Sequence, residues 1–259
     1  MAQKTQRPPL GQHFLRDSHV LERIGSAVEV HAGDIVIEVG PGDGALTAHL
    51  LQRGARVTAI EIDSALAARL RQRFADTATL DIVEADILQV DLAALIGERS
   101  QEPVAVAGNL PYYITSPIVR QVFAASSRIS RAVFLMQKEV ALRVTAGKGS
   151  RDYGFLSVLC ELYAERELLF TVPPGAFRPP PKVTSAVVRL TMRQQGGAPA
   201  ALLTFLEGCF RQPRKTLLNN LSDRYPRSAL AAIACTSHRA QELSLAELRE
   251  LWRRLGAGS

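Results

Sequence analysis

The stretch Ile37-Glu38-Val39-Gly40-Pro41-Gly42-Asp43-Gly44 decides the fold, because it joins an apolar run to a loop with three glycines. A β-rich run that ends in such a loop and leads into a helix is typical of the first turn of a doubly wound sheet. Glycine lets the backbone turn tightly and approach a ligand at the carboxyl end of the strand. The stretch therefore predicts an α/β fold with a ligand site at this turn.

Residues 33–137 alternate β-rich apolar runs with helical patterns. This alternation predicts parallel strands with crossover helices, which together form a doubly wound sheet. The expected strands are Ile35–Val39, Arg56–Ile60, Leu80–Val83, Val104–Ala107 and Ala132–Met136. The expected helices between them are Ala45–Gln52, Ser64–Phe74 and Pro117–Ala124.

The sequence after this region predicts two more helices, Lys138–Thr145 and Tyr153–Tyr163, and two late strands, Glu167–Val172 and Ser185–Met192. The connector Pro173–Pro181 joins the two strands and cannot be regular structure, because proline lacks the backbone donor and fixes φ. We expect the two strands to form an antiparallel hairpin at the sheet edge.

Gln194–Pro199 is the expected linker, and only helical periodicity follows it. The predicted helices there are Ala200–Arg211, Lys215–Leu221, Ser228–Cys235 and Leu245–Leu255. The sequence thus predicts a large domain over residues 1–193, with an N-terminal arm at 1–16, and a small all-α domain over residues 200–259.

Charge is divided unevenly along the chain. Residues 1–186 hold 20 basic and 20 acidic residues, whereas residues 187–259 hold 11 and 5, so the net charge of +6 lies in the last part. A neutral body with a basic appendage indicates a catalytic domain and a polyanion-binding domain. The alternative is a solvated basic surface without a partner.

The bulk composition is that of a globular protein, with 47% hydrophobic and 22% charged residues. No apolar run approaches the roughly 20 residues that span a bilayer, and the N-terminus lacks the apolar core of a secretory signal. The three cysteines, Cys160, Cys209 and Cys235, have no metal-ligand spacing, so we expect free thiols, no metal site and a cytoplasmic location.

The glycine loop fits a dinucleotide poorly. Its spacing is G-x-G-x-G rather than G-x-G-x-x-G, and Glu38 and Asp43 would repel a pyrophosphate. A ligand with cationic ammonium and sulfonium groups and no phosphate fits better, which indicates S-adenosylmethionine. Glu61, at the end of the second strand, could accept both ribose hydroxyls, and Asp86, after the third strand, could accept from the adenine amine.

The fourth strand leads into Gly108-Asn109-Leu110-Pro111-Tyr112-Tyr113, which we expect beside the methyl group of the cofactor. An adenine amine is a poor nucleophile, because its lone pair is delocalised into the ring. The side-chain amide of Asn109 and the carbonyl of Leu110 could accept from this amine and localise the lone pair, while Pro111 holds the turn and Tyr112 stacks on the base. The alternative is a strand-to-loop turn with an Asx hydrogen bond.

Five segments together resemble the bacterial 16S ribosomal RNA adenine dimethyltransferases. The segments are Gly11–Leu15, Glu38–Gly44, Asn109–Tyr112, Met136–Val140 and Phe177–Val183. The resemblance implies a Rossmann-like class I methyltransferase that dimethylates two adjacent adenosines in the 3′-terminal hairpin of 16S ribosomal RNA. It further implies a monomer that acts on an immature small ribosomal subunit and binds no membrane.

The resemblance also assigns roles to residues of this chain. Phe177 would be a second aromatic face for a flipped adenine, as in other enzymes that extrude a base. The cofactor contacts would be His13, Leu15, Gly40, Gly42, Glu61, Asp86 and Asn109. The phosphate-contact candidates are Arg211, Arg214, Lys215, Arg224 and Arg227.

Three rival interpretations stay open at this point. A methyltransferase of large-subunit RNA would usually show Asn-Ile-Pro-Tyr instead of Asn109–Tyr112, and a DNA adenine methyltransferase would more often show Asp-Pro-Pro-Tyr. The third rival is a non-enzymatic ribosome-assembly or transcription factor on the same fold. Phe177 has an alternative of its own, as a core residue of a connector that only links strands.

Overall fold

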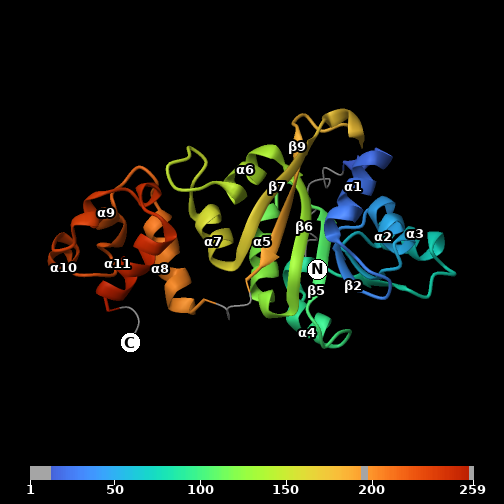
Figure 1. Cartoon of the computed structure of the whole chain (residues 1–259), viewed down its shortest axis with the longest axis horizontal. Helices are drawn as coiled ribbons and strands as arrows, with labels where there is room; N and C mark the ends of the chain where they lie inside the picture. Colours follow the sequence, from blue (N-terminus) through green and yellow to red (C-terminus); the bar gives the residue numbers. More distant parts are fainter. Residues whose placement is uncertain (1–12, 194–197, 257–259) are drawn as a thin grey trace, which may run out of the picture. The chain divides into compact units, whose positions relative to one another are not determined.

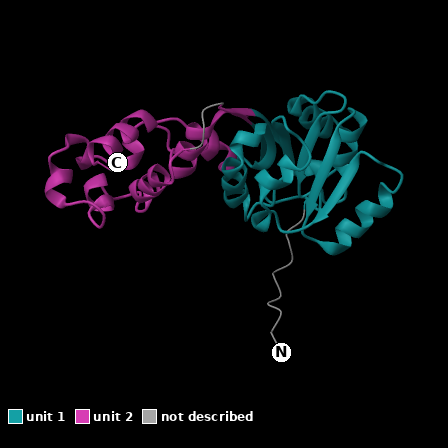
Figure 2. Ribbon diagram, turned by 90° about the horizontal axis from the view of Figure 1, so that it is seen from below, with its two compact units in different colours: residues 1–138, 169–189 teal, residues 139–168, 190–259 magenta. Residues whose placement is uncertain are grey.

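The computed structural model of the chain describes residues 13–193 and 198–256. Most of the expected linker and most of the N-terminal arm therefore lie outside the described residues. The chain divides into two compact units (Figure 2), a first unit of residues 1–138 and 169–189 and a second unit of residues 139–168 and 190–259.

The described residues form a seven-stranded sheet with the strand order β4-β3-β2-β5-β6-β9-β7 (Figure 1). The pairs β2/β3, β3/β4, β2/β5 and β5/β6 are parallel, and the order reverses between β2 and β5. These are the predicted doubly wound strands, and such a reversal opens a crevice at their carboxyl ends. The strands are β2 Ile35–Val39, β3 Arg56–Glu61, β4 Leu80–Glu84, β5 Val104–Asn109, β6 Ile129–Gln137, β7 Ala164–Val172 and β9 Ser185–Met192.

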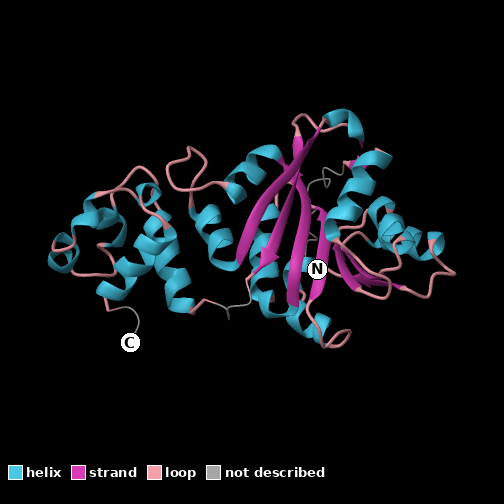
Figure 3. Cartoon of the chain, viewed as in Figure 1, coloured by secondary structure: helices cyan, strands magenta, loops and turns pink. Residues whose placement is uncertain are grey.

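Helices α1 to α4 begin after short segments that contain acidic residues or glycine, whereas α5 follows the turn at residues 110–114. Asp63 caps α3 by accepting from the main-chain N–H groups of Ala65 and Leu66, and Asp91 caps α4 in the same way at Ala94. Helices α1 and α2 pack against each other, as do α4 and α5 (Figure 3). The helices are α1 Ser18–Val28, α2 Ala45–Gln52, α3 Ser64–Arg73, α4 Leu92–Gly97 and α5 Thr115–Ala124.

Several elements of the first unit are not predicted from the sequence, among them helices α1 and α4 and two short strands. The short strands β1, Phe14–Leu15, and β8, Phe177–Arg178, pair antiparallel, with Leu15 opposite Phe177. The late strands β7 and β9 are hydrogen-bonded neighbours with β7 at the sheet edge, as expected for a hairpin. The proline-rich connector therefore contains a short strand, against the expectation that it holds no regular structure, and this strand pairs with the start of the described chain.

The second unit has its own helical core, in which Val158 is fully buried with Leu206 and Cys209. This core draws on α7 as well as the C-terminal helices, so the second unit is larger than the predicted segment 200–259. None of the helices within the described ranges is long and apolar enough to cross a membrane. The helices are α6 Lys138–Thr145, α7 Phe155–Tyr163, α8 Ala200–Phe210, α9 Leu217–Leu221, α10 Arg227–Ala231 and α11 Leu245–Arg254.

Candidate active site

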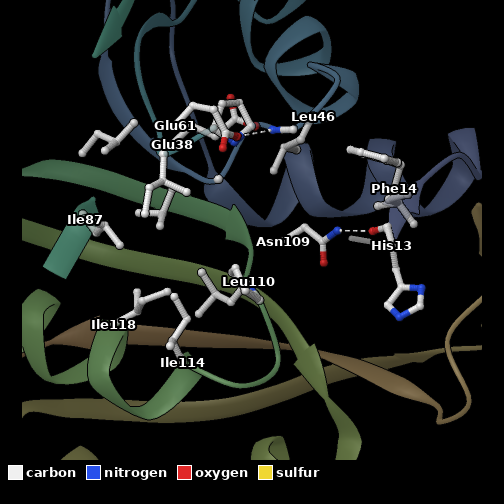
Figure 4. A pocket seen from close by; sticks show the side chains of 18 of the residues that line it. His13, Phe14, Glu38, Leu46, Glu61, Ile87, Asn109, Leu110, Ile114 and Ile118 are labelled. Atoms are coloured by element: carbon white, nitrogen blue, oxygen red, sulfur yellow. Dashed lines mark hydrogen bonds between the residues drawn. The ribbon is translucent and has the colours of Figure 1, made fainter. Parts of the chain in front are cut away.

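A cavity of about 370 Å³ lies in the first unit, where β2, β3, β4 and β5 end (Figure 4). This is the crevice that the reversal of strand order predicts. Ten of the eleven residues predicted for the cofactor and the chemistry line it: His13, Leu15, Gly40, Gly42, Glu61, Asp86, Asn109, Leu110, Pro111 and Tyr112.

Main-chain atoms of the glycine loop, residues 40–44, form part of the wall of this cavity. Gly42 has a φ of 60°, in the left-handed region that favours glycine, and a Cβ there would lie 3.1 Å from the Phe14 ring. Gly108 is needed for a different reason, because a Cβ there would lie 2.5 Å from the Val39 carbonyl oxygen. The close approach of β5 to β2 at Gly108 sets the position of the next residue, Asn109.

Glu61 links the ends of two strands at the cavity. Its Oε2 accepts from the Gly42 main-chain N–H at 3.1 Å, and its Oε1 accepts from the Asp63 N–H at 3.0 Å. The side chain is nearly buried, and this burial raises the pKa of the carboxyl group. Each carboxylate oxygen can accept more than one hydrogen bond, so Glu61 can also accept hydroxyl donors from a ligand.

Glu38 is a second buried carboxyl group, which the sequence placed beside the ligand without assigning it a contact. It is 1% exposed and accepts from the Thr47 hydroxyl at 2.7 Å. Burial, followed by the nearby carboxylates of Glu61 and Asp43, raises its pKa to about 7. The cavity therefore has an acidic wall whose charge changes near neutral pH.

Asn109 is held by a hydrogen bond that leaves its acceptor available. Its Nδ2 donates to the His13 main-chain carbonyl at 3.0 Å, the dashed line beside His13 in Figure 4. With the nitrogen engaged, Oδ1 is the group that can accept from a ligand. The following peptide is fixed as well, since the Leu110 N–H donates to the Leu135 carbonyl at 2.9 Å.

Tyr112 stacks against His13 and is anchored at its hydroxyl. The two rings lie 5.9 Å apart at 27°, and the tyrosine hydroxyl lies 2.6 Å from the Ser185 Oγ. The His13 ring is anchored in turn by a hydrogen bond between Nδ1 and the Pro179 carbonyl, at 2.8 Å. The Asn109–Tyr112 segment is thus joined to both the N-terminal segment and the proline-rich connector.

Phe177 is the exception among the predicted residues. Its side chain is fully buried in a hydrophobic cluster with Leu15 and Val187, and it does not line the cavity. The assignment of its ring as a face for a base does not agree with this placement. Apolar burial accounts for the phenylalanine, as in the alternative of a core residue.

Asp86 caps the short 3₁₀ turn Ile87–Gln89 by accepting from the Leu88 N–H at 3.0 Å, and it also lines the cavity. Other lining residues were not predicted, because their apolar or turn-forming types carry no chemical signal in the sequence. They include Phe14, Pro41, Leu46, Ile62, Ile87, Leu88, Tyr113, Ile114 and Ile118.

The predicted phosphate contacts lie in the second unit, in and after the loop between α8 and α9, and all five side chains are exposed. Arg211 pairs with Asp223 at 2.7 Å, and Arg224 donates to the Thr204 carbonyl at 2.9 Å. The other three are Arg214, Lys215 and Arg227.

The doubly wound sheet, with an acidic and glycine-lined cavity at its switch point, defines a Rossmann-like class I methyltransferase. Solved structures agree with this class. A dimethyladenosine transferase from Plasmodium falciparum has a TM-score of 0.78 and 25% identity, covering 94% of this chain and 98% of that chain. A 23S rRNA methyltransferase, ErmE, has a TM-score of 0.66 and 32% identity, covering 94% and 99%.

The chain belongs to the ribosomal RNA adenine dimethylase family, whose model matches residues 3–250. It is similar to the ribosomal RNA small subunit methyltransferase A of Acidobacterium capsulatum, with 47% identity over 96% of this chain and 91% of the relative. The protein of the same name from Koribacter versatilis is 40% identical over 99% and 98%. The chain is therefore a methyltransferase that acts on adenine in ribosomal RNA, as its resemblance predicted.

Proposed function

We propose that the chain transfers methyl groups from S-adenosylmethionine to the exocyclic amines of two adjacent adenosines in the 3′-terminal hairpin of 16S ribosomal RNA. The small-subunit names of the relatives at 40–47% identity support this substrate over large-subunit RNA. The substrate would be an immature small ribosomal subunit in the cytoplasm, and the enzyme would act as a monomer.

The cavity fits S-adenosylmethionine by the chemistry of its lining. The buried carboxyl groups of Glu38 and Glu61 suit a ligand that carries positive charge, and Ile62 and Ile87 offer apolar surface to its adenine. Glu61 would hold the ribose hydroxyls, and Asp86 the adenine amine. The other proposed contacts are His13, Leu15, Gly40, Gly42 and Asn109. When bound there, this cofactor supplies an electrophilic methyl group.

The observation that carries the proposal is the fixed orientation of Asn109 at the cavity. The hydrogen bond from Nδ2 to the His13 carbonyl holds the amide and supports Oδ1 as an acceptor, and the Leu110 carbonyl would be the second. Accepting from both hydrogens of the adenine amine favours a tetrahedral nitrogen and localises its lone pair. Pro111 would hold this turn, and Tyr112 would stack on the base. We do not assign Phe177 a face of the base, because its ring is buried.

RNA affinity would come from the basic side chains of the second unit. Guanidinium and ammonium groups at exposed positions bind phosphates with little dependence on sequence. These side chains are Arg211, Arg214, Lys215, Arg224 and Arg227.

The deciding experiment offers the protein immature small subunits and large-subunit RNA in parallel, with labelled S-adenosylmethionine. Mass spectrometry of the nucleosides then counts methyl groups on each adenine. We expect dimethyladenosine at two adjacent positions of the 3′-terminal hairpin. Methylation of large-subunit RNA alone would show that large-subunit RNA is the substrate. Methylation of cytosine or ribose would refute the proposed reaction at the adenine amine.

A further inference from the structure

A second cavity, of about 280 Å³, lies in the first unit next to the one described above. The two cavities share Phe14 and Asp43 as lining residues. The floor of the second cavity is apolar, with Leu66 6% and Leu70 1% exposed. Its remaining lining residues are three exposed arginines, Arg16, Arg69 and Arg73, for which the proposed mechanism has no use.

Asp43 organises two of these arginines. Arg16 Nη2 lies 2.6 Å from Asp43 Oδ2, and Arg73 donates from Nη1 to the Asp43 main-chain carbonyl. Arg73 also lies over the Phe74 ring, with 5.0 Å between the guanidinium carbon and the ring centroid. Asp43, which follows Gly42 in the glycine loop, therefore holds the guanidinium groups of Arg16 and Arg73 outside the cofactor cavity.

Arg69 completes the group from the same helix as Arg73. The two residues are four positions apart on α3, so they neighbour each other on one side of the helix. Three arginines and one aspartate line this cavity, which leaves an excess of positive charge. Planar guanidinium groups bind phosphate oxygens through paired hydrogen bonds.

We propose that this cavity binds a phosphate group of the substrate RNA backbone beside the active site. The inference rests on the proposed function and adds a phosphate contact in the first unit to those in the second. A phosphate contact carries no sequence information, but it sets the register of the RNA. Since the cavity shares Asp43 and Phe14 with the cofactor cavity, the contact would position the strand close to Asn109.

The test compares Arg69→Gln with Arg71→Gln, a matched control on the same helix. Arg71 is also exposed, but it pairs with Glu84 at 3.2 Å and does not line the cavity. Binding of the 3′-terminal hairpin RNA is measured over a series of salt concentrations, and cofactor affinity by calorimetry. We expect Arg69→Gln to weaken RNA binding several-fold and to flatten the slope of log affinity against log salt by about 0.7–0.9. Arg71→Gln should match the wild type, and both variants should bind cofactor normally.

A wild-type salt slope in Arg69→Gln would overturn the inference. The phosphate bound in the cavity could belong to the RNA backbone or be free inorganic phosphate, and a melting experiment distinguishes the two. If millimolar inorganic phosphate raises the melting temperature of the wild type but not of Arg69→Gln, and the salt slope of RNA binding is the same in both proteins, the cavity is a site for free phosphate. Methyl transfer by the wild type to small subunits is scored separately. Its absence would refute the proposed function, whatever the salt slope.

Discussion

The side chain of Asn109 donates a hydrogen bond to the main-chain carbonyl of His13, 96 residues earlier in the sequence. This bond joins the end of β5 to the segment that enters β1, and it decides which atom of the amide can meet a substrate. The role of Asn109 in catalysis therefore depends on orientation as well as on residue type.

Asn109→Ala should lower the rate of methyl transfer by about 10²–10³, because one oriented acceptor contributes roughly 3–4 kcal/mol to a transition state. RNA binding should change much less. Single-turnover transfer to immature small subunits measures the rate, and Gln101→Ala, which removes an amide from an exposed loop, serves as the control. Wild-type turnover in Asn109→Ala would eliminate the acceptor mechanism.

Glu61→Ala should weaken binding of S-adenosylmethionine by at least tenfold. The loss of charge-assisted hydrogen bonds to two hydroxyls corresponds to roughly 1.5–3 kcal/mol. Calorimetry measures the affinity, and Glu84→Ala, which removes an exposed carboxylate, should bind as the wild type does. Affinity within twofold of wild type in Glu61→Ala would show that another group holds the ribose.

Glu38 should make the protein less stable as pH rises toward neutral. Its pKa is about 7 in the folded state against 4.5 for the unfolded chain, so the folded state binds more protons between these values. Stability from this group is complete below pH 4.5 and is lost as pH rises through 7. At 1.36 kcal/mol per unit, the loss is roughly 3 kcal/mol.

Glu38→Gln removes this titration and should flatten the dependence. Urea unfolding of both proteins at pH 5 and pH 8 measures the effect. The wild type should lose more stability across this interval than Glu38→Gln does. Parallel losses in the two proteins would mean that the pKa of Glu38 is close to its ordinary value.

The sequence predicted the central strands well, because buried parallel strands are short apolar runs bounded by turn residues. Ile35–Val39 matches β2 residue for residue. The sequence did not predict β1 and β8, since two-residue strands have no periodicity. Helix α1 was missed although its signals are present: Asp17 caps it, and Val20, Ile24 and Val28 recur at helical spacing.

The sequence predicted those site residues whose role follows from a polar side chain at the end of a strand. Glu61 and Asn109 are such residues, and both line the cavity. The raised pKa of Glu38 was not predictable, because it comes from burial, and burial depends on the packing of segments whose proximity the sequence does not show. The side chain of Phe177 could not be placed from sequence for the same reason: a ring in a connector can face a ligand or the core, and in the structure it packs with Leu15 and Val187.

Neutralising three basic side chains of the second unit should change how RNA binding depends on salt. The triple variant Arg211→Gln, Arg214→Gln and Lys215→Gln should flatten the slope of log affinity against log salt. The expected change is up to about 0.7–0.9 for each phosphate that the variant no longer neutralises. Cofactor affinity should not change.

A second triple variant, Arg249→Gln, Arg253→Gln and Arg254→Gln, removes the same charge from α11 and is the matched control. Equal slopes in the two triple variants would mean that net charge alone governs RNA binding. An unaltered slope in the first would place the RNA surface elsewhere.

The contrast between Tyr112 and Phe177 tests the assignment of the aromatic residues. Phe177→Leu keeps an apolar side chain in the core and should retain most methyl transfer, whereas Phe177→Ala should lower the free energy of unfolding by about 3–5 kcal/mol. Tyr112→Leu should instead lose base stacking, about 1–3 kcal/mol, with little loss of stability beyond the hydroxyl contact to Ser185. Urea unfolding and single-turnover transfer, measured on the same preparations, separate the two effects. If the Phe177→Leu protein is stable and binds cofactor but transfers no methyl group, the Phe177 ring takes part in the reaction and must leave its buried position to do so.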